Sequence, residues 1–303
     1  DLENIDCHDL FKSFSPAVAF NEVSQSYLVV WTANHFPGNL NENQADLLGT
    51  LSQLKAGVTS GEREVFGRVI HPDGPVLDEG FRISDMGPDV SPFFAARYPA
   101  ISCNVYNKSC LVVWTGVALP PAVRDASAEI FGQMVEVNNV GGLSLPQVVL
   151  PQANPLLDDD FQISNARLQD QLALPFNVAP SNIVFQYARP AITYNDDDNS
   201  FLVAWWGSVA EGVGGPPPTE IFGKIVDAIA GNESDDFQIT DMQIRQRGDF
   251  KLPAVTYDNQ SGHFIVLWSK GDVYGQLLDE DGNKIASDYR ISDMKGQPFV
   301  SGF

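Results

Sequence analysis

PAITYNDDDNSFLVAW, residues 190–205, is the stretch from which the architecture follows, because the chain repeats its pattern four times. The other copies begin at Pro16, Pro99 and Pro253, and each ends in a tryptophan at the same distance from its proline. Every copy is followed by a strand-like run around a glycine, such as IFGKIV, and then by an FRISD-like segment. Four strand-like runs per repeat, with no helical unit, are typical of a β-propeller blade. We therefore expect an all-β, four-bladed β-propeller with four-stranded antiparallel blades.

The repeats extend over nearly all of the 303 residues and predict a single domain covering residues 1–303. Long insertions interrupt the first three repeats, and loops of this length in a compact domain are usually functional. The tail KGQPFVSGF is similar to the linkers that precede the repeat prolines, so we expect the ring to close where the termini meet. The approximate blades are 16–86, 99–166, 190–242 and 253–294.

Inside each repeat the second strand is almost wholly apolar, as in LVVW, LVAW and IVLW, which predicts burial on both faces. The glycine of the third strand is expected where the tryptophan of an adjacent blade approaches too closely for a side chain. The tryptophans themselves are interpreted as core residues, with a ring of sugar-stacking aromatics as the alternative. They are Trp31, Trp114, Trp205 and Trp268.

The charge excludes some partners. The chain carries 39 acidic and 18 basic residues, a formal net charge of −21. Such a field repels nucleic acid and anionic membranes. No apolar run approaches the roughly 18 residues that a membrane-spanning helix needs. We expect neither a nucleic-acid partner nor a membrane span.

Two cysteines occupy a repeated pair of positions. In the other repeats these positions hold aromatic residues, for example Tyr194 and Phe201, which flank the hairpin between the first two strands. In the second repeat they hold Cys103 and Cys110. Residues that face each other across a hairpin lie close enough for a disulfide after small adjustment. We predict that bond, with two buried free thiols as the alternative, and a disulfide indicates an oxidising compartment.

Three glycosylation sequons also favour secretion. They begin at Asn107, Asn232 and Asn259, and the first and last fall in a hairpin turn, where an acceptor asparagine is exposed. Cys7 is left over and is either free or bridged to another chain. We expect a secreted, extracellular glycoprotein.

One equivalent position just after the fourth strand carries oxygen ligands in every repeat. If these side chains faced a common axis, they would form a ring of ligands for Ca²⁺. Capping of turns explains them equally well. The residues are Asp85, Asn165, Asp241 and Asp293.

The most unusual inserts are apolar and rich in proline, at residues 118–123, 143–157 and 172–185. A soluble protein seldom exposes a large apolar patch without use. Three interpretations stay open: a lid or small core, an interface between subunits of a homo-oligomer, and a cleft for a small hydrophobic ligand such as a lipid or pigment. Trp206, present in one repeat only and expected to start a loop, is a further contact. The remaining predicted ligand contacts are Leu145, Val148, Leu150, Leu174, Phe176 and Val178.

Catalytic signals are weak. The four histidines stand at non-equivalent places, and no G-x-S-x-G, P-loop, dinucleotide or H-E-x-x-H motif is present. Among 39 acidic residues, sequence alone does not identify a carboxylate pair suited to glycoside hydrolysis. We therefore expect no catalytic activity.

The repeat resembles one found in secreted and cell-surface proteins, with the pattern PAVAY…YLVVW…IYGQRV…F.IS. The resemblance covers nearly the whole chain and implies a β-propeller in an extracellular setting. It implies no reaction and no catalytic residues. The leading hypothesis is a secreted, non-catalytic binding protein for a hydrophobic ligand, and the alternatives are a carbohydrate-binding lectin and a polysaccharide-acting enzyme.

Overall fold

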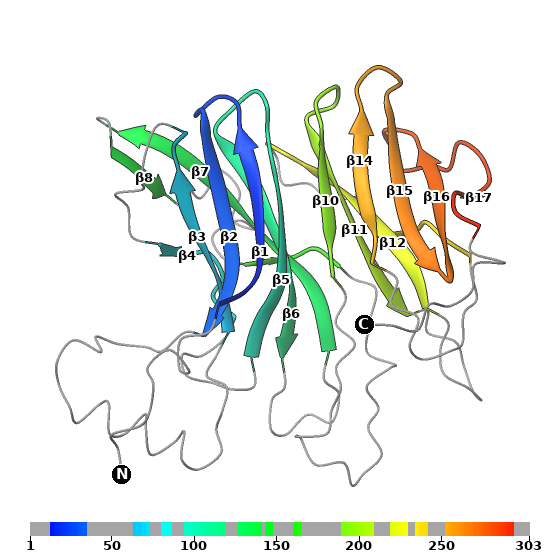
Figure 1. Ribbon diagram of the computed structural model, residues 1–303, viewed down its shortest axis with the longest axis horizontal. Coiled ribbons are helices and arrows are strands. Elements are labelled where there is room, and N and C mark those ends of the chain that lie inside the picture. The colour runs from blue at the N-terminus through cyan, green and yellow to red at the C-terminus, as the bar shows by residue number, and fades with distance from the viewer. Residues whose placement is uncertain are drawn as a thin grey trace, which may run out of the picture.

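The computed structural model is all-β in the part of the chain that it describes, with seventeen strands and no helix there. The strands form four antiparallel units, each built from one sequence repeat (Figure 1). The described residues are 13–34, 63–72, 80–86, 94–118, 127–140, 143–147, 160–164, 189–208, 219–229, 234–241 and 252–293.

Each unit begins with two strands of five to ten residues joined by a tight hairpin and ends with a two-residue strand. The strands of unit 1 are β1 (Ser13–Asn21), β2 (Ser26–Asn34), β3 (Arg63–Ile70) and β4 (Phe81–Arg82). Those of unit 2 are β5 (Phe94–Cys103), β6 (Ser109–Ala118), β7 (Ser127–Val140), β8 (Leu143–Gln147) and β9 (Phe161–Gln162). Those of unit 3 are β10 (Ala191–Asn195), β11 (Ser200–Ser208), β12 (Thr219–Asp227) and β13 (Phe237–Gln238). Those of unit 4 are β14 (Ala254–Asp258), β15 (His263–Lys270), β16 (Asp272–Leu278) and β17 (Tyr289–Arg290).

The hairpin register agrees with the spacing of the repeats. Tyr194 pairs with Phe201 in β10–β11, and the two rings lie 5.0 Å apart between centroids. Cys103 pairs with Cys110 at the same place in β5–β6, and their sulfur atoms are bonded. The predicted disulfide is therefore confirmed, and it takes the place of the aromatic pair that the other units use.

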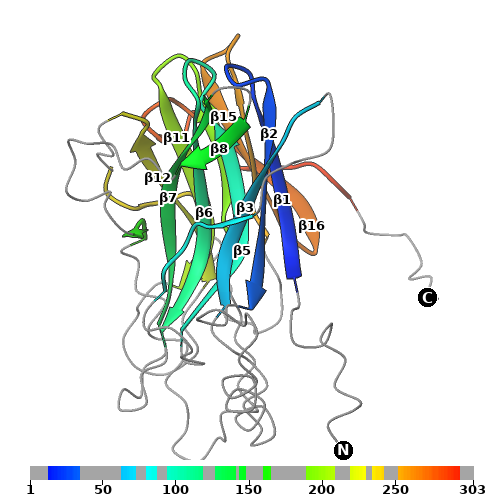
Figure 2. The ribbon, with the colours of Figure 1, turned by 90° about the vertical axis from the view of Figure 1, so that its left-hand side faces the viewer.

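The units stand in a row with their first strands together. β1 contacts β5, β5 contacts β10 and β10 contacts β14, so these inner strands lie side by side (Figures 1 and 2). Units 1 and 2 also share one parallel bridge, between Arg63 and Ala95. The row does not close: unit 1 and unit 4 lie at its opposite ends (Figure 1). The expectation of a closed ring is wrong for the described residues, because no strand joins the two end units.

The core lies between the units. Trp114, Trp205 and Trp268 are at most 2 % exposed, and each packs in a cluster shared with the preceding unit. In units 2 and 3 the second strand is buried on both faces, as the apolar runs predict. These tryptophans are core residues.

The repeated glycine has a different cause from the one expected. A Cβ on Gly132 would lie 2.7 Å from Cδ1 of Ile163, and one on Gly67 would lie 2.8 Å from Cδ1 of Ile83. Both isoleucines follow the short fourth strand of the same unit. The close neighbour is thus the unit's own last strand, not the tryptophan of an adjacent unit.

Part of the apolar insert of the second repeat is a strand. β8 pairs antiparallel with the end of β7, from Glu136 opposite Gln147 to Val140 opposite Leu143. Pro146 lies in this strand, which is at the edge of the sheet, the place where a missing N–H costs no ladder bond. The loop expected over residues 143–147 is therefore a strand that widens unit 2.

A carboxylate on the third strand bonds to a hydroxyl that follows the short last strand in every unit, and this carboxylate is buried in units 1 to 3 and partly buried in unit 4. In unit 3 the Thr240 hydroxyl donates to Glu220 Oε2 at 2.6 Å and accepts from the Ile221 N–H at 2.8 Å. Glu220 is 1 % exposed. The equivalent acid and hydroxyl pairs are Glu64 with Ser84, Glu129 with Ser164 and Asp272 with Ser292.

Thr240→Val is expected to lower the free energy of unfolding by about 2–4 kcal/mol. The variant keeps the shape of the side chain, yet it removes a donor from a buried carboxylate and the acceptor of a buried N–H. Urea denaturation measures the loss, and Thr240→Ser, which keeps the hydroxyl, is the matched control. Equal stability of Thr240→Val and the unmodified protein would show that this contact does not stabilise the unit.

Candidate functional site

The four hairpin turns gather at one edge of the molecule, the upper edge in Figure 1. Each turn starts with an asparagine or aspartate that closes on its own backbone. Asn104 Oδ1 accepts the Tyr106 N–H at 2.7 Å, and Asn195 Oδ1 accepts the Asp197 N–H at 2.9 Å. Such side-chain turns set the shape of each hairpin tip. Asn21 and Asp258 stand at the equivalent positions of units 1 and 4.

The turns are bonded to one another. Asn21 Nδ2 donates to the carbonyl oxygen of Asn107 at 2.9 Å, which joins unit 1 to unit 2. Asn104 Nδ2 donates to Asn199 Oδ1 at 2.7 Å, which joins unit 2 to unit 3. Asn21 and Asn104 are at most 1 % exposed, so the amide groups that donate these bonds are buried. The edge is consequently one connected surface and not a set of separate loops.

One cluster on this edge is built from residues of units 2, 3 and 4. It combines aromatic rings with the carboxylates of unit 3. The Tyr106 hydroxyl donates to the carbonyl oxygen of Asp196 at 2.9 Å, while the residue is 66 % exposed. Tyr257 donates to Asp197 Oδ2 at 2.6 Å, and Asn259 Nδ2 reaches Asp196 Oδ2 at 3.3 Å. We call Tyr106, Asp196, Asp197, Tyr257 and Asn259 the turn site.

The turn site carries several negative charges. Desolvation raises the pKa of Tyr257, and the hydrogen bond to Asp197 and the nearby charge of Asp196 raise it further. Burial, followed by the charges around it, likewise raises the pKa of Tyr194 beside the site. Both phenols stay protonated at neutral pH and act as donors. The site therefore offers carboxylate acceptors, phenol and amide groups and one open aromatic ring.

The turn site was not predicted from the sequence, although a signal was present. The residue after each PAxxx segment is Asn21, Asn104, Asn195 or Asp258, a turn-forming residue at one position of all four repeats. The individual turns differ in sequence, and their side chains form a common site only when the units pack next to one another.

The structure gives a different place to Trp206 from the one expected. Trp206 lies inside β11, paired with Ile221, and is 5 % exposed. It packs in the cluster shared by units 3 and 4 and does not start a loop. Leu145 lies in β8, opposite Asn138. The other predicted apolar contacts lie outside the described residues: Val148, Leu150, Leu174, Phe176 and Val178.

Two of the predicted calcium ligands form ion pairs with arginine side chains. Asp85 pairs with Arg82, and Asp293 pairs with Arg290 at 2.6 Å. Asp241 is exposed, and Asn165 lies outside the described residues. Among the residues with described positions, no group of three or more histidine, cysteine or acidic residues is arranged to hold a metal. The calcium ring stays a prediction.

Two of the sequons are visible at the turns. Asn107 is exposed, and its side-chain oxygen accepts the Ser109 N–H at 2.8 Å. Asn259 is exposed and belongs to the turn site, whereas Asn232 lies outside the described residues. Throughout the part of the chain described above, no helix is long and apolar enough to cross a membrane.

Comparison with known proteins finds likeness in structure only. No protein-family model matches the sequence, so the repeat family that it resembles is not identified, and no curated protein matches it. One similar structure is an N-acetylgalactosamine deacetylase from F. plautii, with 10 % identity and a TM-score of 0.42 over 91 % of this chain and 70 % of that one. Another is a beta-fructofuranosidase from Microbacterium saccharophilum K-1, with 9 % identity and a TM-score of 0.42 over 94 % and 59 %. A third is Trypanosoma rangeli sialidase, with 8 % identity and a TM-score of 0.46 over 93 % and 38 %.

These neighbours correct two expectations. They are named as enzymes that act on carbohydrates, which contradicts the expectation of a non-catalytic protein for a hydrophobic ligand and the expectation of no enzymatic activity. The chain spans 59 % of the fructofuranosidase and 38 % of the sialidase. At 8–10 % identity the likeness assigns no residue of this chain to a reaction. The fold itself is all-β and propeller-like, with a row of units that is not closed.

Proposed function

We propose that the protein acts on a polysaccharide that binds at the turn site. The observation that carries this proposal is the position of Tyr106, whose ring is open to solvent while its hydroxyl is anchored on Asp196. An immobilised aromatic ring offers a sugar a flat apolar surface without the entropic cost of ordering a mobile side chain. Carboxylate and amide groups next to it supply the directional bonds that a sugar's hydroxyl groups require.

Each residue of the turn site has a separate proposed role in binding or catalysis. Tyr106 is the stacking platform, and Asp196 and Asn259 are the groups that select hydroxyl groups. Asp196 and Asp197 supply carboxylates, the groups that most glycoside hydrolysis depends on. Tyr257 lies within proton-transfer distance of Asp197 at 2.6 Å, the reach that an acid–base pair needs. Its raised pKa keeps the proton on the phenol in the resting site.

The charge of the site restricts the substrate. Asp196, Asp197 and Glu280 all raise the pKa of Tyr257, so several negative charges act on one small surface. The whole chain carries a net charge of −21. A polysaccharide rich in carboxylates or sulfates would be repelled by this field. We therefore propose a neutral polysaccharide or one that contains amino sugars.

Tyr106→Ala is expected to weaken polysaccharide binding about tenfold, the equivalent of roughly 1.4 kcal/mol. Binding is measured by a glycan array and then by calorimetry with the best soluble neutral polymer. Val23→Ala is the matched control, because Val23 is an exposed apolar residue on the hairpin turn of unit 1, outside the turn site. Equal losses in both variants would mean that Tyr106 is not a stacking platform.

The catalytic part of the proposal has its own test. Release of new reducing ends from the bound polymer is expected for the unmodified protein, and Asp197→Asn is expected to abolish it while the fold is kept. Recovery of the bound polymer unchanged would reduce the proposal to binding alone, as in a lectin. Loss of neither binding nor turnover in Asp197→Asn would place the chemistry elsewhere.

Several finer statements belong to the same proposal. We propose that the four units are blades of a propeller and that residues 1–303 form one domain. We propose further that the protein is secreted and glycosylated at Asn107, Asn232 and Asn259. The Cys103–Cys110 disulfide supports an oxidising compartment, and the exposed turns of Asn107 and Asn259 support modification.

A further inference from the structure

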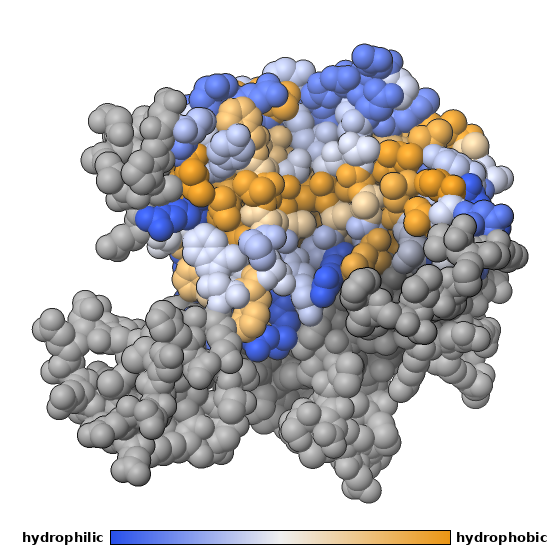
Figure 3. Space-filling model, viewed as in Figure 1, coloured by the Kyte–Doolittle hydropathy of each residue, from blue (hydrophilic) through white to orange (hydrophobic). Residues whose placement is uncertain are grey.

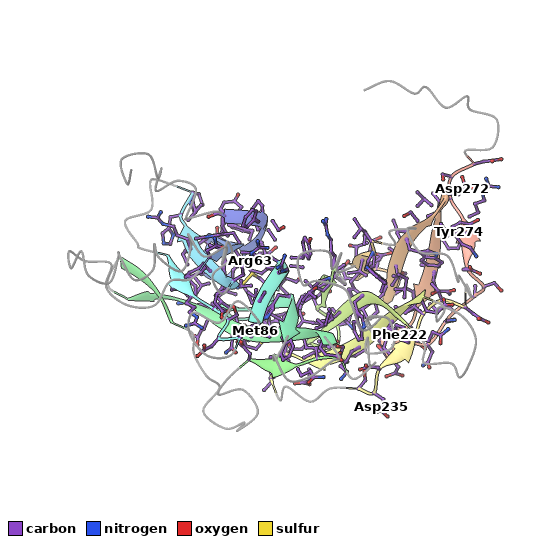
Figure 4. All side chains as sticks on the ribbon, turned by 90° about the horizontal axis from the view of Figure 1, so that it is seen from below. Arg63, Met86, Phe222, Asp235, Asp272 and Tyr274 are labelled. Carbon is purple, nitrogen blue, oxygen red and sulfur yellow. A yellow bond between two sulfur atoms is a disulfide. The ribbon has the colours of Figure 1, made fainter. Side chains whose placement is uncertain are left out.

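Every unit has two faces, and among the described residues two of these faces have no neighbouring unit. We call the side that carries the tryptophan, toward the preceding unit, the leading face, and the opposite side the trailing face. Three pairs of faces meet inside the chain: unit 1 with 2, unit 2 with 3 and unit 3 with 4. The leading face of unit 1 and the trailing face of unit 4 are left over, at opposite ends of the row. Figure 4 shows Tyr274 of unit 4 far from Arg63 of unit 1, with the strands of units 2 and 3 between them.

The leading face of unit 1 exposes residues that the other units bury. Phe20 and Tyr27 are 39 % and 41 % exposed, while the equivalent Tyr194 and Phe201 are 8 % and 0 % exposed. Trp31 is only partly buried, unlike the other three repeat tryptophans. A hollow of about 220 Å³ opens beside Trp31, lined by Ser13, Phe14, Pro16 and Trp31 itself.

The inner strands show the same change at the end of the row. Val18 is 58 % exposed, whereas the equivalent Ile101, Ile192 and Val255 are partly buried against the preceding unit. Together the apolar residues of the inner strands form a band across the face of the molecule (Figure 3). Val18 lies on β1, the first inner strand of the row, beside which no further described unit stands.

The trailing face of unit 4 differs from its equivalents in the same way. Ile291 is 51 % exposed, but Ile83, Ile163 and Ile239 at the same position are at most 6 % exposed. Val273 is 37 % exposed, although its counterparts in the other units are fully buried. The two free faces thus carry the two halves of an interface that the chain already builds three times.

We propose that two copies of the chain associate head to tail, with the trailing face of unit 4 on the leading face of unit 1 in the partner. Such a contact joins two different faces, and it closes into a ring when both ends are paired. Two copies place eight units in the ring, which is within the usual range of about four to eight blades, whereas three copies exceed it. This inference does not depend on the proposed polysaccharide activity.

The mass of the intact protein in solution tests the association. Light scattering on the eluate of a sizing column is expected to give twice the chain mass of 33.1 kDa. Ile291→Asp and Phe20→Asp each place a charge on one free face, and each is expected to give a monomer. Ile229→Asp is the matched control, because Ile229 is 71 % exposed and lies in the turn after β12, off both faces.

A mixing experiment distinguishes head-to-tail contact from other dimers. Ile291→Asp keeps an intact leading face, and Phe20→Asp keeps an intact trailing face. Differently tagged samples of the two variants are expected to form a mixed dimer through one intact interface, although neither dimerises alone. Unaltered circular dichroism spectra of both variants show that the units are still folded.

Three results would overturn the proposal. The first is a monomeric unmodified protein at every concentration of the assay. The second is a disulfide within one chain of monomer mass when Ile291→Cys and Tyr27→Cys are combined, because unit 4 would then cover unit 1 of the same molecule. A dimer that Ile291→Asp and Phe20→Asp leave intact would also contradict it, since another surface would hold the copies together.

Discussion

Trp205→Ala is expected to lower the free energy of unfolding by about 3–5 kcal/mol. Trp205 is fully buried in the cluster between units 2 and 3, where it lies beside Phe222 with 6.5 Å between ring centroids. Removal of the indole takes away a large apolar surface and leaves a cavity that the paired strands cannot fill by collapsing. Urea denaturation, with the transition followed by fluorescence of the remaining tryptophans, measures the loss.

Trp31→Ala is the informative comparison, because Trp31 occupies the same repeat position on a free face. In a monomeric sample its loss is expected to be less than half of that for Trp205→Ala, since part of the ring is already in water. In a sample of the associated protein, Trp31→Ala is expected to weaken the dimer and to make the unfolding midpoint depend on concentration. Equal losses for both variants at low concentration would mean that Trp31 is as well packed as Trp205, against the exposure described above.

Removal of the disulfide by Cys103→Ala and Cys110→Ala together is expected to lower the free energy of unfolding by about 2.5 kcal/mol. The bond closes a loop with a sequence separation of 7 residues, so it restricts the unfolded chain only modestly. Loss of packing adds to this, because Cys110 is fully buried between units 1 and 2. A smaller loss, from the bond alone, is expected when the unmodified protein is unfolded under reducing conditions, because the thiol groups then stay in place.

The chain itself suggests the control for the disulfide. Cys103→Tyr combined with Cys110→Phe copies the pair Tyr194 and Phe201 into unit 2. This variant is expected to recover part of the lost stability through ring contact and to be insensitive to reductant. If the alanine variant were as stable as the unmodified protein, the bond would have no stabilising role and the hairpin would be held by its neighbours alone.

The oxidation state of Cys103 and Cys110 also affects the turn site. The disulfide lies directly below the turn that carries Asn104 and Tyr106, since Cys103 and Cys110 flank that hairpin. Asn104 bonds across to Asn199, and Tyr106 bonds to Asp196. Stabilisation of this hairpin therefore holds the proposed stacking platform in register with the carboxylates of unit 3.

Spacing within each repeat was sufficient to predict the strand pairs and the disulfide. The side chains of a strand alternate with a period of two, so a constant offset from proline to tryptophan defines the hairpin register. Cys103 opposite Cys110 follows directly from Tyr194 opposite Phe201. These contacts are local, because both partners lie within one hairpin.

Contacts between distant segments depended on the tertiary structure. Trp206 is buried because unit 4 covers it, and the glycines are required because an isoleucine from the fourth strand returns across them. The open row, its two unpaired faces and the turn site arise from how units pack on one another. Sequence periodicity describes the inside of a repeat, whereas the angle between repeats results from many weak side-chain contacts summed over each interface. That sum leaves Phe20 and Ile291 exposed and brings Tyr106 to Asp196.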